Sequence, residues 1–309
     1  MPVVAFHSSL DSPADWEPAL RRHLPDLDWR TDERPGDPAE VQAVLAWKPP
    51  PGYFARFPGL RLVVNLGAGA DALLGRDDLP AVPISRLNDP GMVRLMTSYV
   101  VFAVTRHARD IPAFEAAQRR REWRYIHPRP LDACRVGVLG LGELGAAAAL
   151  ALAAMGYTVR GWSRSPKSLP GIGCLHGEAG LRALLAATDV LVVMLPLTGA
   201  TRGLLDAGML ALLPRGAALV NVGRGPVVAE AALVEALRSG RLGGATLDVF
   251  DREPLPPEHP LWAMENVLIT PHIASITVPG EAAPDVAESI RRVLAGRPPL
   301  HEVQAGRGY

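Results

Sequence analysis

Three charged residues in the second half of the chain combine side chains that could act together on a small acid. Arg224 stands in G-R-G-P, Glu253 in D-R-E-P and His272 in T-P-H-I. A guanidinium binds a carboxylate through paired hydrogen bonds, and an imidazole exchanges protons near neutral pH. A neighbouring carboxylate can orient that imidazole and favour its charged form. We therefore expect Arg224 to bind an acid group, His272 to donate a proton and Glu253 to orient His272.

The chemistry that needs such a set is the reduction of a 2-oxo acid. Its carboxylate must be held while a hydride and a proton reach the carbonyl group, and a nicotinamide can supply the hydride. Taken singly, Arg224 could be a loop cation, Glu253 a solvated turn residue and His272 a structural histidine. Their shared position just beyond late strands favours the catalytic interpretation, because ligands of doubly wound sheets bind beyond the carboxyl ends of the strands.

A glycine-rich loop supplies a candidate site for the nicotinamide cofactor. Residues 136–145 read V-G-V-L-G-L-G-E-L-G, an apolar strand that runs into a glycine turn and then an alanine-rich helix. In this arrangement Gly140 allows the tight turn, Gly142 lets a pyrophosphate approach the backbone, and Gly145 allows close helix packing. The motif predicts dinucleotide binding, although the same glycines would also suit a tight turn in a domain without nucleotide.

The end of the following strand indicates which dinucleotide is bound. An NAD site usually has an acidic residue there that binds the adenosine ribose. Here the strand T-V-R-G-W leads into Ser163, Arg164 and Lys167, with no acid. A carboxylate would repel a 2′-phosphate, whereas the two cations would attract one. We predict NADP rather than NAD; the alternative is that these are solvent-facing turn residues.

These candidates need parallel strands to position them. Short β-type runs alternate with helical patterns, which is typical of βαβ units. The expected strands are 3–7, 41–47, 61–66 and 82–86, then 135–139, 157–162, 190–195, 217–222, 243–249 and 266–270. A long helical region from 92 to about 124 should be interrupted near 111–112.

The predicted fold class is α/β, with two doubly wound parallel-sheet domains. Residues 1–91 plus 276–309 are expected to form a discontinuous flavodoxin-like substrate domain, and residues 92–275 a Rossmann NADP-binding domain. The active site is expected between them.

Composition excludes several other classes of protein. The 309 residues carry 32 Lys and Arg against 32 Asp and Glu, so no basic field favours nucleic acid. No apolar run is long enough for a membrane span, and the N-terminus lacks the pattern of a signal peptide. Cys134 and Cys174 are expected to be reduced thiols in a cytoplasmic protein. The histidines form no cluster with the cysteines, so we expect no metal.

Several longer motifs then carry a resemblance to a known family. They are A-W-K-P-P at 46–50, L-G-A-G-A-D at 66–71, R-L-N-D-P-G-M at 86–92, W-S-R-S at 162–165, N-V-G-R-G at 221–225, L-D-V-F-D-R-E-P-L-P-P-E at 247–258, T-P-H-I-A at 270–274 and the terminal R-G-Y. The chain resembles the D-2-hydroxyacid dehydrogenase family along nearly its whole length. Within that family it is most similar to the bacterial A-type glyoxylate/hydroxypyruvate reductases.

The resemblance assigns roles to individual residues. It implies that Arg224, Glu253 and His272 are catalytic, with His272 as the acid/base. The expected cofactor-binding residues are Gly140, Gly142, Glu143, Leu144, Gly145, Ser163, Arg164, Lys167, Leu195, Pro196, Val222 and Asp248, the last of these at the nicotinamide carboxamide. The expected substrate-binding residues are Trp47, Ala68, Gly69 and Arg224. The resemblance also implies a homodimer joined through the cofactor domains, with region 92–130 at the interface.

The activity implied is NADPH-dependent reduction of glyoxylate or hydroxypyruvate. Two alternatives remain open: a reductase of larger 2-oxo acids, such as a 2-ketoaldonate or an aryl pyruvate, and a dinucleotide-sensing binding protein without catalysis. Glu143 departs from the usual loop, so its carboxylate must point away from the pyrophosphate. Lys48 could attract an anionic substrate or could be only a lysine at the rim.

Overall fold

The chain folds into two parallel sheets, each with its own helices. The structure is a computed structural model, and it describes residues 1–87 and 89–304. Unit 1 comprises Met1–Met92 and Ile276–Tyr309, and unit 2 comprises Val93–Ser275. Asn88 in the 86–92 motif and the terminal R-G-Y lie outside the described residues.

Unit 1 is built on a five-stranded sheet in which every pairing is parallel. Its strands are β1 (Val3–Ser8), β2 (Asp28–Arg30), β3 (Ala43–Trp47), β4 (Leu62–Asn65) and β5 (Ile84–Arg86), in the order β2-β1-β3-β4-β5. This is the flavodoxin-like order. Its helices are α1 (Pro13–Arg21) and α8 (Pro279–Leu294), which pack together, with short 3₁₀ turns η1 (Pro38–Glu40) and η2 (Phe54–Arg56).

Unit 2 contains a seven-stranded parallel sheet. Its strands are β6 (Arg135–Leu139), β7 (Thr158–Ser163), β8 (Gly173–His176), β9 (Val190–Val193), β10 (Ala217–Asn221), β11 (Leu242–Leu247) and β12 (Val267–Ile269). Their order is β12-β11-β10-β9-β6-β7-β8, which is the doubly wound dinucleotide-binding order with one further strand, β12, at its edge. The predicted fold class is therefore confirmed.

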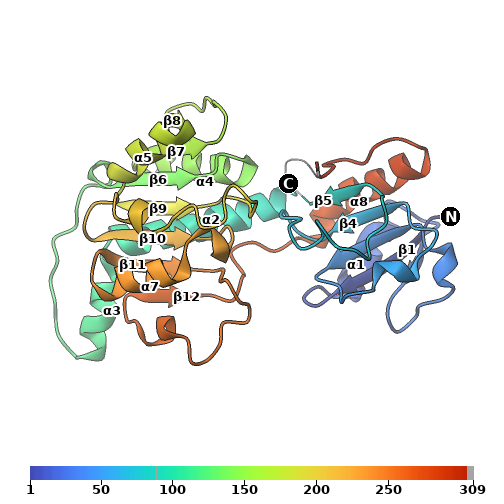
Figure 1. Ribbon diagram of the computed structural model, residues 1–309, viewed down its shortest axis with the longest axis horizontal. Coiled ribbons are helices and arrows are strands. Elements are labelled where there is room, and N and C mark those ends of the chain that lie inside the picture. The colour runs from blue at the N-terminus through green and yellow to red at the C-terminus, as the bar shows by residue number, and fades with distance from the viewer. Residues whose placement is uncertain (88, 305–309) are drawn as a thin grey trace. The chain divides into compact units, whose positions relative to one another are not determined.

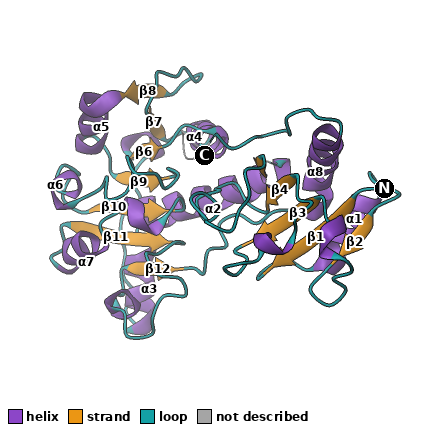
Figure 2. Cartoon of the chain, turned by 45° about the vertical axis from the view of Figure 1, so that its right-hand side comes forward, coloured by secondary structure: helices purple, strands orange, loops and turns teal. Residues whose placement is uncertain are grey.

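Helices cover both faces of the unit 2 sheet (Figures 1 and 2). They are α2 (Pro90–Ala108), α3 (Ile111–Arg119), α4 (Glu143–Ala154), α5 (Gly177–Ala186), α6 (Ala207–Leu210) and α7 (Glu230–Arg238), with 3₁₀ turns η3 (Leu131–Ala133), η4 (Gly225–Val227) and η5 (Pro260–Ala263). Leucines of α5, α6 and α7 pack in one core, and apolar residues of α2 and α4 pack in another. The chain passes from unit 1 into unit 2 within α2.

Most expected elements are present, and the differences have simple causes. The predicted interruption of the long helical region is confirmed, since α2 ends at Ala108 and α3 begins at Ile111. Strands β2 and β8 were not predicted. Both are edge strands, and only Trp29 among their residues is buried. Neither D-W-R nor G-C-L-H therefore has the apolar run by which a strand is predicted.

Parallel pairing brings the carboxyl ends of the strands to one edge of each sheet, which is where the candidate residues of each unit lie. No helix among residues 1–87 and 89–304 is long and apolar enough to cross a membrane.

Candidate active site

The loop that carries Arg224 is fastened to the end of β10 by a buried asparagine. Asn221, 2% exposed, accepts a hydrogen bond from the Gly223 amide (3.1 Å) and donates one to the Arg224 carbonyl oxygen (3.1 Å). The Arg224 guanidinium donates to the Gly223 carbonyl oxygen at 2.8 Å. Gly225 then packs so closely that a Cβ there would lie 2.0 Å from the carbonyl carbon of Phe250. The half-buried Arg224 therefore stands on a firmly held loop.

His272 and Glu253 are brought together from the segments that follow β12 and β11. The His272 Nδ1 lies 2.9 Å from Glu253 Oε2, with side-chain exposures of 24% and 21%. Because an ionised carboxylate only accepts hydrogen bonds, Nδ1 donates in this pair. The other carboxylate oxygen, Oε1, accepts from the Phe250 amide at 3.2 Å. Glu253 thus fixes the imidazole through Nδ1, which leaves Nε2 as the ring nitrogen that could exchange a proton with a ligand.

Asp248 lies just beyond β11 and holds the segment that contains His272. Its Oδ1 accepts from the Thr270 hydroxyl (2.6 Å) and the Ile273 amide (2.8 Å), and its Oδ2 accepts from the Ala274 amide (2.9 Å). The side chain of Asp248 is 1% exposed, so these bonds are screened from water. His272, inside this segment, has a left-handed backbone with φ of 58°. Sequence reasoning did not single out Thr270, because a threonine before P-H-I carries no signal of its own.

The glycine loop forms a cradle of the shape a pyrophosphate needs. Gly140 has φ of 103°, and α4 begins at Glu143 directly after Gly142. A Cβ on Gly142 would meet nothing within 4 Å, whereas one on Gly145 would lie 1.8 Å from the Gly140 carbonyl oxygen. Gly142 therefore faces open space and Gly145 is required for packing. The first-turn amides of α4 and the helix dipole suit an anion at this point, so the residues fit a dinucleotide. Leu144, in the same turn, is half-buried.

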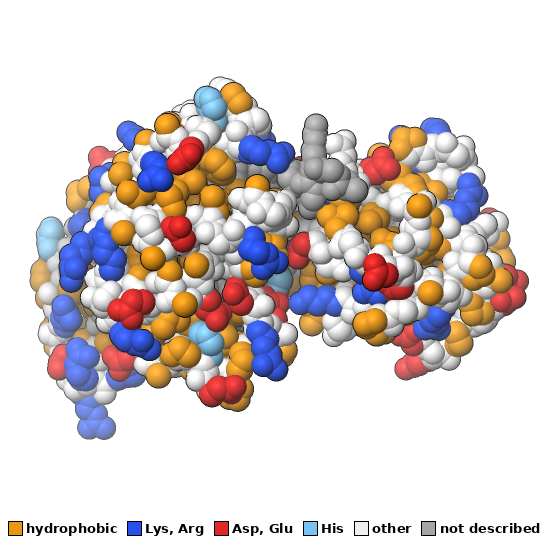
Figure 3. Space-filling view, viewed as in Figure 1, with side chains coloured by type: hydrophobic (Ala, Val, Ile, Leu, Met, Phe, Trp, Pro, Cys, Tyr) orange, Lys and Arg blue, Asp and Glu red, His pale blue; other side chains and the backbone are white. Residues whose placement is uncertain are grey.

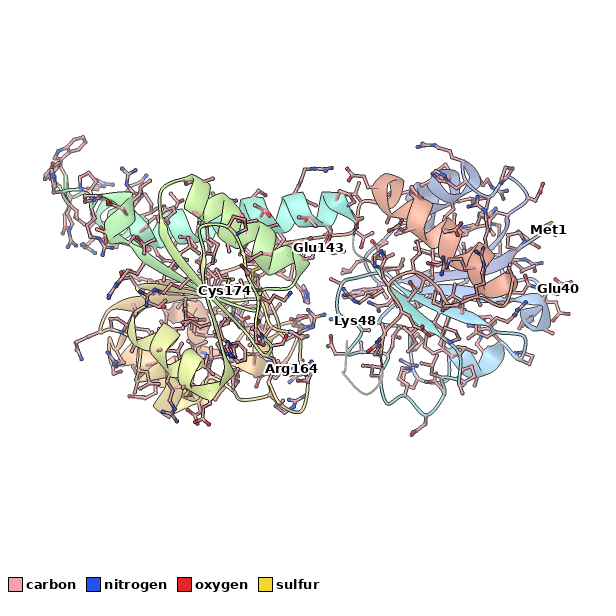
Figure 4. All side chains as sticks on the ribbon, turned by 90° about the horizontal axis from the view of Figure 1, so that it is seen from above. Met1, Glu40, Lys48, Glu143, Arg164 and Cys174 are labelled. Atoms are coloured by element: carbon pink, nitrogen blue, oxygen red, sulfur yellow. The ribbon has the colours of Figure 1, made fainter. Side chains whose placement is uncertain are left out.

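Ser163 at the end of β7 and the residues just beyond it each make a different contact. Ser163 is buried, and its hydroxyl donates to the Ser165 carbonyl oxygen at 2.7 Å. Arg164 is exposed, and Figure 4 labels it together with Glu143 in unit 2. The Lys167 ammonium donates to the Leu141 carbonyl oxygen at 2.7 Å, so this lysine is tied to the glycine loop. A cation is therefore present at both the glycine loop and the strand end.

Three further expected cofactor residues lie at the same edge of the sheet. Leu139, Val193 and Asn221 are in register across β6, β9 and β10. Leu195 and Val222 follow two of these strands and are buried, and Pro196 is half-buried.

Unit 1 brings together its own candidates at the ends of β3 and β4. Asn65, 1% exposed, donates through Nδ2 to the carbonyl oxygens of Gly67 and Gly69, both at 2.9 Å. The loop that contains Ala68 is thereby curled over a single side chain. A Cβ on Gly67 would lie 2.4 Å from the Trp47 ring, so the indole packs directly on this loop. Lys48 follows with φ of 46°, a second left-handed residue beyond a strand.

Charged side chains of both signs lie on the surface of the molecule. Figure 3 shows Lys and Arg interspersed with Asp and Glu on the face that it presents. In the part of the chain that the structure describes, no group of three or more His, Cys, Asp or Glu side chains could hold a metal ion.

A doubly wound sheet with a glycine-loop cradle and an Arg, Glu and His set at its strand ends defines a dinucleotide-dependent dehydrogenase. Residues 101–274 match the family model described as D-isomer specific 2-hydroxyacid dehydrogenase, NAD binding domain. The chain belongs to this family.

Relatives and solved structures agree with the family along the whole chain. A protein of Yersinia enterocolitica named glyoxylate/hydroxypyruvate reductase A is 37% identical, with all of both chains covered. A D-isomer specific 2-hydroxyacid dehydrogenase of Xanthobacter autotrophicus Py2, solved with NADPH and MES, is 58% identical at a TM-score of 0.95, covering 100% and 99% of the chains. An NADPH-dependent glyoxylate/hydroxypyruvate reductase of Sinorhizobium meliloti, solved with NADP and sulfate, is 37% identical at a TM-score of 0.94, covering all of both chains.

Proposed function

We propose that the protein reduces small 2-oxo acids with NADPH, converting glyoxylate to glycolate and hydroxypyruvate to D-glycerate. The observation that carries this proposal is the His272–Glu253 pair, which stands at the strand ends of the dinucleotide-binding unit together with the Arg224 loop. The names of full-length relatives, glyoxylate/hydroxypyruvate reductase A and NADPH-dependent glyoxylate/hydroxypyruvate reductase, support the substrate class.

The chemistry follows from the donors that the chain supplies. NADPH, when bound, supplies the hydride that adds to the carbonyl carbon of the substrate. Arg224 binds the substrate carboxylate and polarises the carbonyl oxygen through its planar fork of N–H donors. His272 gives the proton on Nε2 to that oxygen, which completes the alcohol. Glu253 stabilises the imidazolium before transfer and keeps Nδ1 protonated after it.

Two sets of residues bind the two ligands in this proposal. Arg164 attracts the 2′-phosphate, for which a carboxylate at the strand end would be repulsive, and the amides at the start of α4 bind the pyrophosphate. The amides of Ala68 and Gly69 bind the substrate carboxylate, and Trp47 forms an apolar wall. The NADP–containing neighbours support the choice of cofactor.

We further propose a homodimer through region 92–130. Within this region Trp123 is fully exposed, Tyr125 is 76% exposed and Phe102 is 52% exposed, and exposed large apolar side chains are typical of association surfaces. We also propose a cytoplasmic location, in which Cys134, which is buried, and Cys174 are reduced thiols.

The test is the oxidation of NADPH, followed by absorbance, with glyoxylate or hydroxypyruvate as the second substrate. Turnover of at least one of them with NADPH, and a product identified as the corresponding 2-hydroxy acid, is the expected result. Tight NADPH binding without turnover of any 2-oxo acid would instead identify a dinucleotide-sensing protein and overturn the proposal.

A further inference from the structure

A chain of hydrogen bonds connects helix α2 to the segment that carries His272. The Tyr99 hydroxyl lies 2.5 Å from the Thr270 hydroxyl, which lies 2.6 Å from Asp248 Oδ1. A hydroxyl has one proton, and the carboxylate can only accept, so Thr270 gives its proton to Asp248. Tyr99 must then donate to Thr270. Three successive groups therefore have one consistent direction of donation, from α2 to the end of β11.

Asp248, the acceptor at the end of this chain of hydrogen bonds, also binds the backbone that follows His272. Asp248 takes the Ile273 amide on Oδ1 and the Ala274 amide on Oδ2. The His272 backbone has φ of 58°, a conformation that L side chains rarely adopt and that persists only when surrounding contacts impose it. Thr270 lies before this residue, and the two amides lie after it. The carboxylate thus fastens the chain on both sides of the unfavourable conformation.

Tyr99 is suited to act as a permanent donor. It lies on α2, where it is half-buried, and burial raises the pKa of Tyr99 to about 12. Its hydroxyl therefore keeps its proton at neutral pH. The Tyr99–Thr270 bond spans 171 positions of the chain, so it fixes a tertiary relation that no local turn could provide.

We propose that Tyr99 and Thr270 are positioning residues, which lock Asp248 in place and thereby hold His272 in the left-handed conformation that aligns its imidazole. This inference rests on the proposed function in one respect, since His272 must be the proton donor for the alignment to affect the rate. The clamp on the Ile273 and Ala274 amides does not depend on that function.

A second threonine of the same sheet provides a matched control. Thr246 on β11 is fully buried, and its hydroxyl lies 3.0 Å from His107 Nε2, also on α2. Both threonines therefore connect α2 to the sheet through one hydroxyl. The Thr246 hydroxyl, however, contacts His107 rather than the segment 270–274, so its loss removes a similar contact without releasing His272.

The test compares Thr270→Val with Thr270→Ser, Tyr99→Phe and the control Thr246→Val in the full-length protein. For Thr270→Val we expect kcat for glyoxylate to fall by roughly 10- to 100-fold, the cost of misplacing a reacting group by up to about 1 Å. KM should change far less than kcat, and Thr270→Ser should restore most of the rate. Tyr99→Phe should give a smaller loss in kcat, and Thr246→Val should lower the melting temperature while leaving kcat near that of the parent.

Amide hydrogen exchange provides a readout that is independent of activity. The Ile273 and Ala274 amides should exchange faster in Thr270→Val, by roughly fivefold for the net loss of one hydrogen bond, and should keep the parent rate in Thr246→Val. Unchanged exchange and unchanged kcat in Thr270→Val would overturn the positioning role. If the parent protein turned over no 2-oxo acid, the proposed function would fail, and so would the catalytic part of this inference; faster exchange would then support the clamp alone.

Discussion

Each unit has one buried asparagine at the carboxyl end of a central strand, and the two side chains make different hydrogen bonds. Asn65 ends β4 and donates to two carbonyl oxygens of the following loop. Asn221 ends β10 and both donates to and accepts from its loop. The first loop, G-A-G-A, can offer a ligand only its backbone, whereas the second, G-R-G, offers the Arg224 side chain.

This difference indicates how substrate binding and the chemical step are divided between the two units. At the strand ends of unit 2, side chains with acid/base chemistry are fixed by other side chains, as in the His272–Glu253 pair. At the strand ends of unit 1, one side chain fixes a loop whose amides are proposed to bind the substrate carboxylate. Unit 1 is therefore expected to contribute to substrate binding alone, whereas unit 2 contributes to substrate binding through Arg224 and to the chemical step through His272.

The largest effect is expected from His272→Ala. Removal of a positioned proton donor should lower kcat by roughly 10²–10⁴-fold, while NADPH affinity changes little because the glycine loop is untouched. Steady-state kinetics and a fluorescence titration with NADPH would measure the two quantities. His259→Ala is the control, since His259 also pairs with a carboxylate, Glu230, at 3.1 Å in the same unit. Near-normal turnover in His272→Ala would show that the chemical step does not take place at this edge of unit 2.

Reversal of charge at Arg164 should alter the choice of cofactor. Loss of a charged hydrogen bond to the 2′-phosphate should lower kcat/KM for NADPH by roughly 10- to 100-fold in Arg164→Asp, with little loss for NADH. Arg160→Asp makes the same charge change at another exposed position, within β7, and should preserve the preference. Equal use of both cofactors by the parent protein would contradict the role of Arg164.

Stability against acid should differ between the units because of one buried histidine. Burial, with a smaller contribution from Arg106, lowers the pKa of His107 in unit 2 from 6.5 to about 4. Between these values the unfolded chain binds a proton that the folded chain does not, so stability is lost as the pH falls. The free energy of unfolding should drop by about 2 kcal/mol between about pH 7 and about pH 5 from this group.

His107→Gln should remove this component, because glutamine does not titrate. Urea unfolding of the parent and variant at the two pH values would measure it, and hydrogen exchange would show whether unit 2 opens first. An identical acid response in parent and variant would show that His107 does not distinguish the units.

The smallest effects should come from the two asparagines and should differ in kind. Asn65→Ala and Asn221→Ala each leave buried backbone groups unsatisfied, which should cost roughly 1–2 kcal/mol of stability. Asn65→Ala should raise KM for glyoxylate with kcat nearly unchanged, the signature of lost uniform binding. Asn221→Ala should lower kcat as well, because Arg224 loses its fixed position. The same kinetic change in both variants would contradict the proposed difference between the two units.

The sequence predicts the parts of this structure that depend on local pattern. The glycine turn after an apolar strand, the strands β6 and β10 and the break between α2 and α3 all follow from residues near one another in the chain. The edge strands β2 and β8 could not be predicted in this way, since they pair with the sheet without an apolar pattern of their own.

The contacts that hold the candidate site residues in place could not be predicted from the sequence either. The bond between Tyr99 and Thr270 joins residues 171 positions apart, and either side chain alone is an ordinary surface or core residue of its element. Asn65 likewise acts through carbonyl oxygens that any sequence possesses. Arg224, Glu253 and His272 could be singled out because they share a position just beyond predicted strands, whereas the groups that hold them carry no such signal.

A substrate series would show whether this protein is an NADPH-dependent reductase of small 2-oxo acids. We would measure kcat/KM with NADPH for glyoxylate, hydroxypyruvate, a 2-ketoaldonate and phenylpyruvate under one set of conditions. Glyoxylate and hydroxypyruvate should have the highest values. A series led by phenylpyruvate or the ketoaldonate, or one in which no acid is turned over, would contradict this activity.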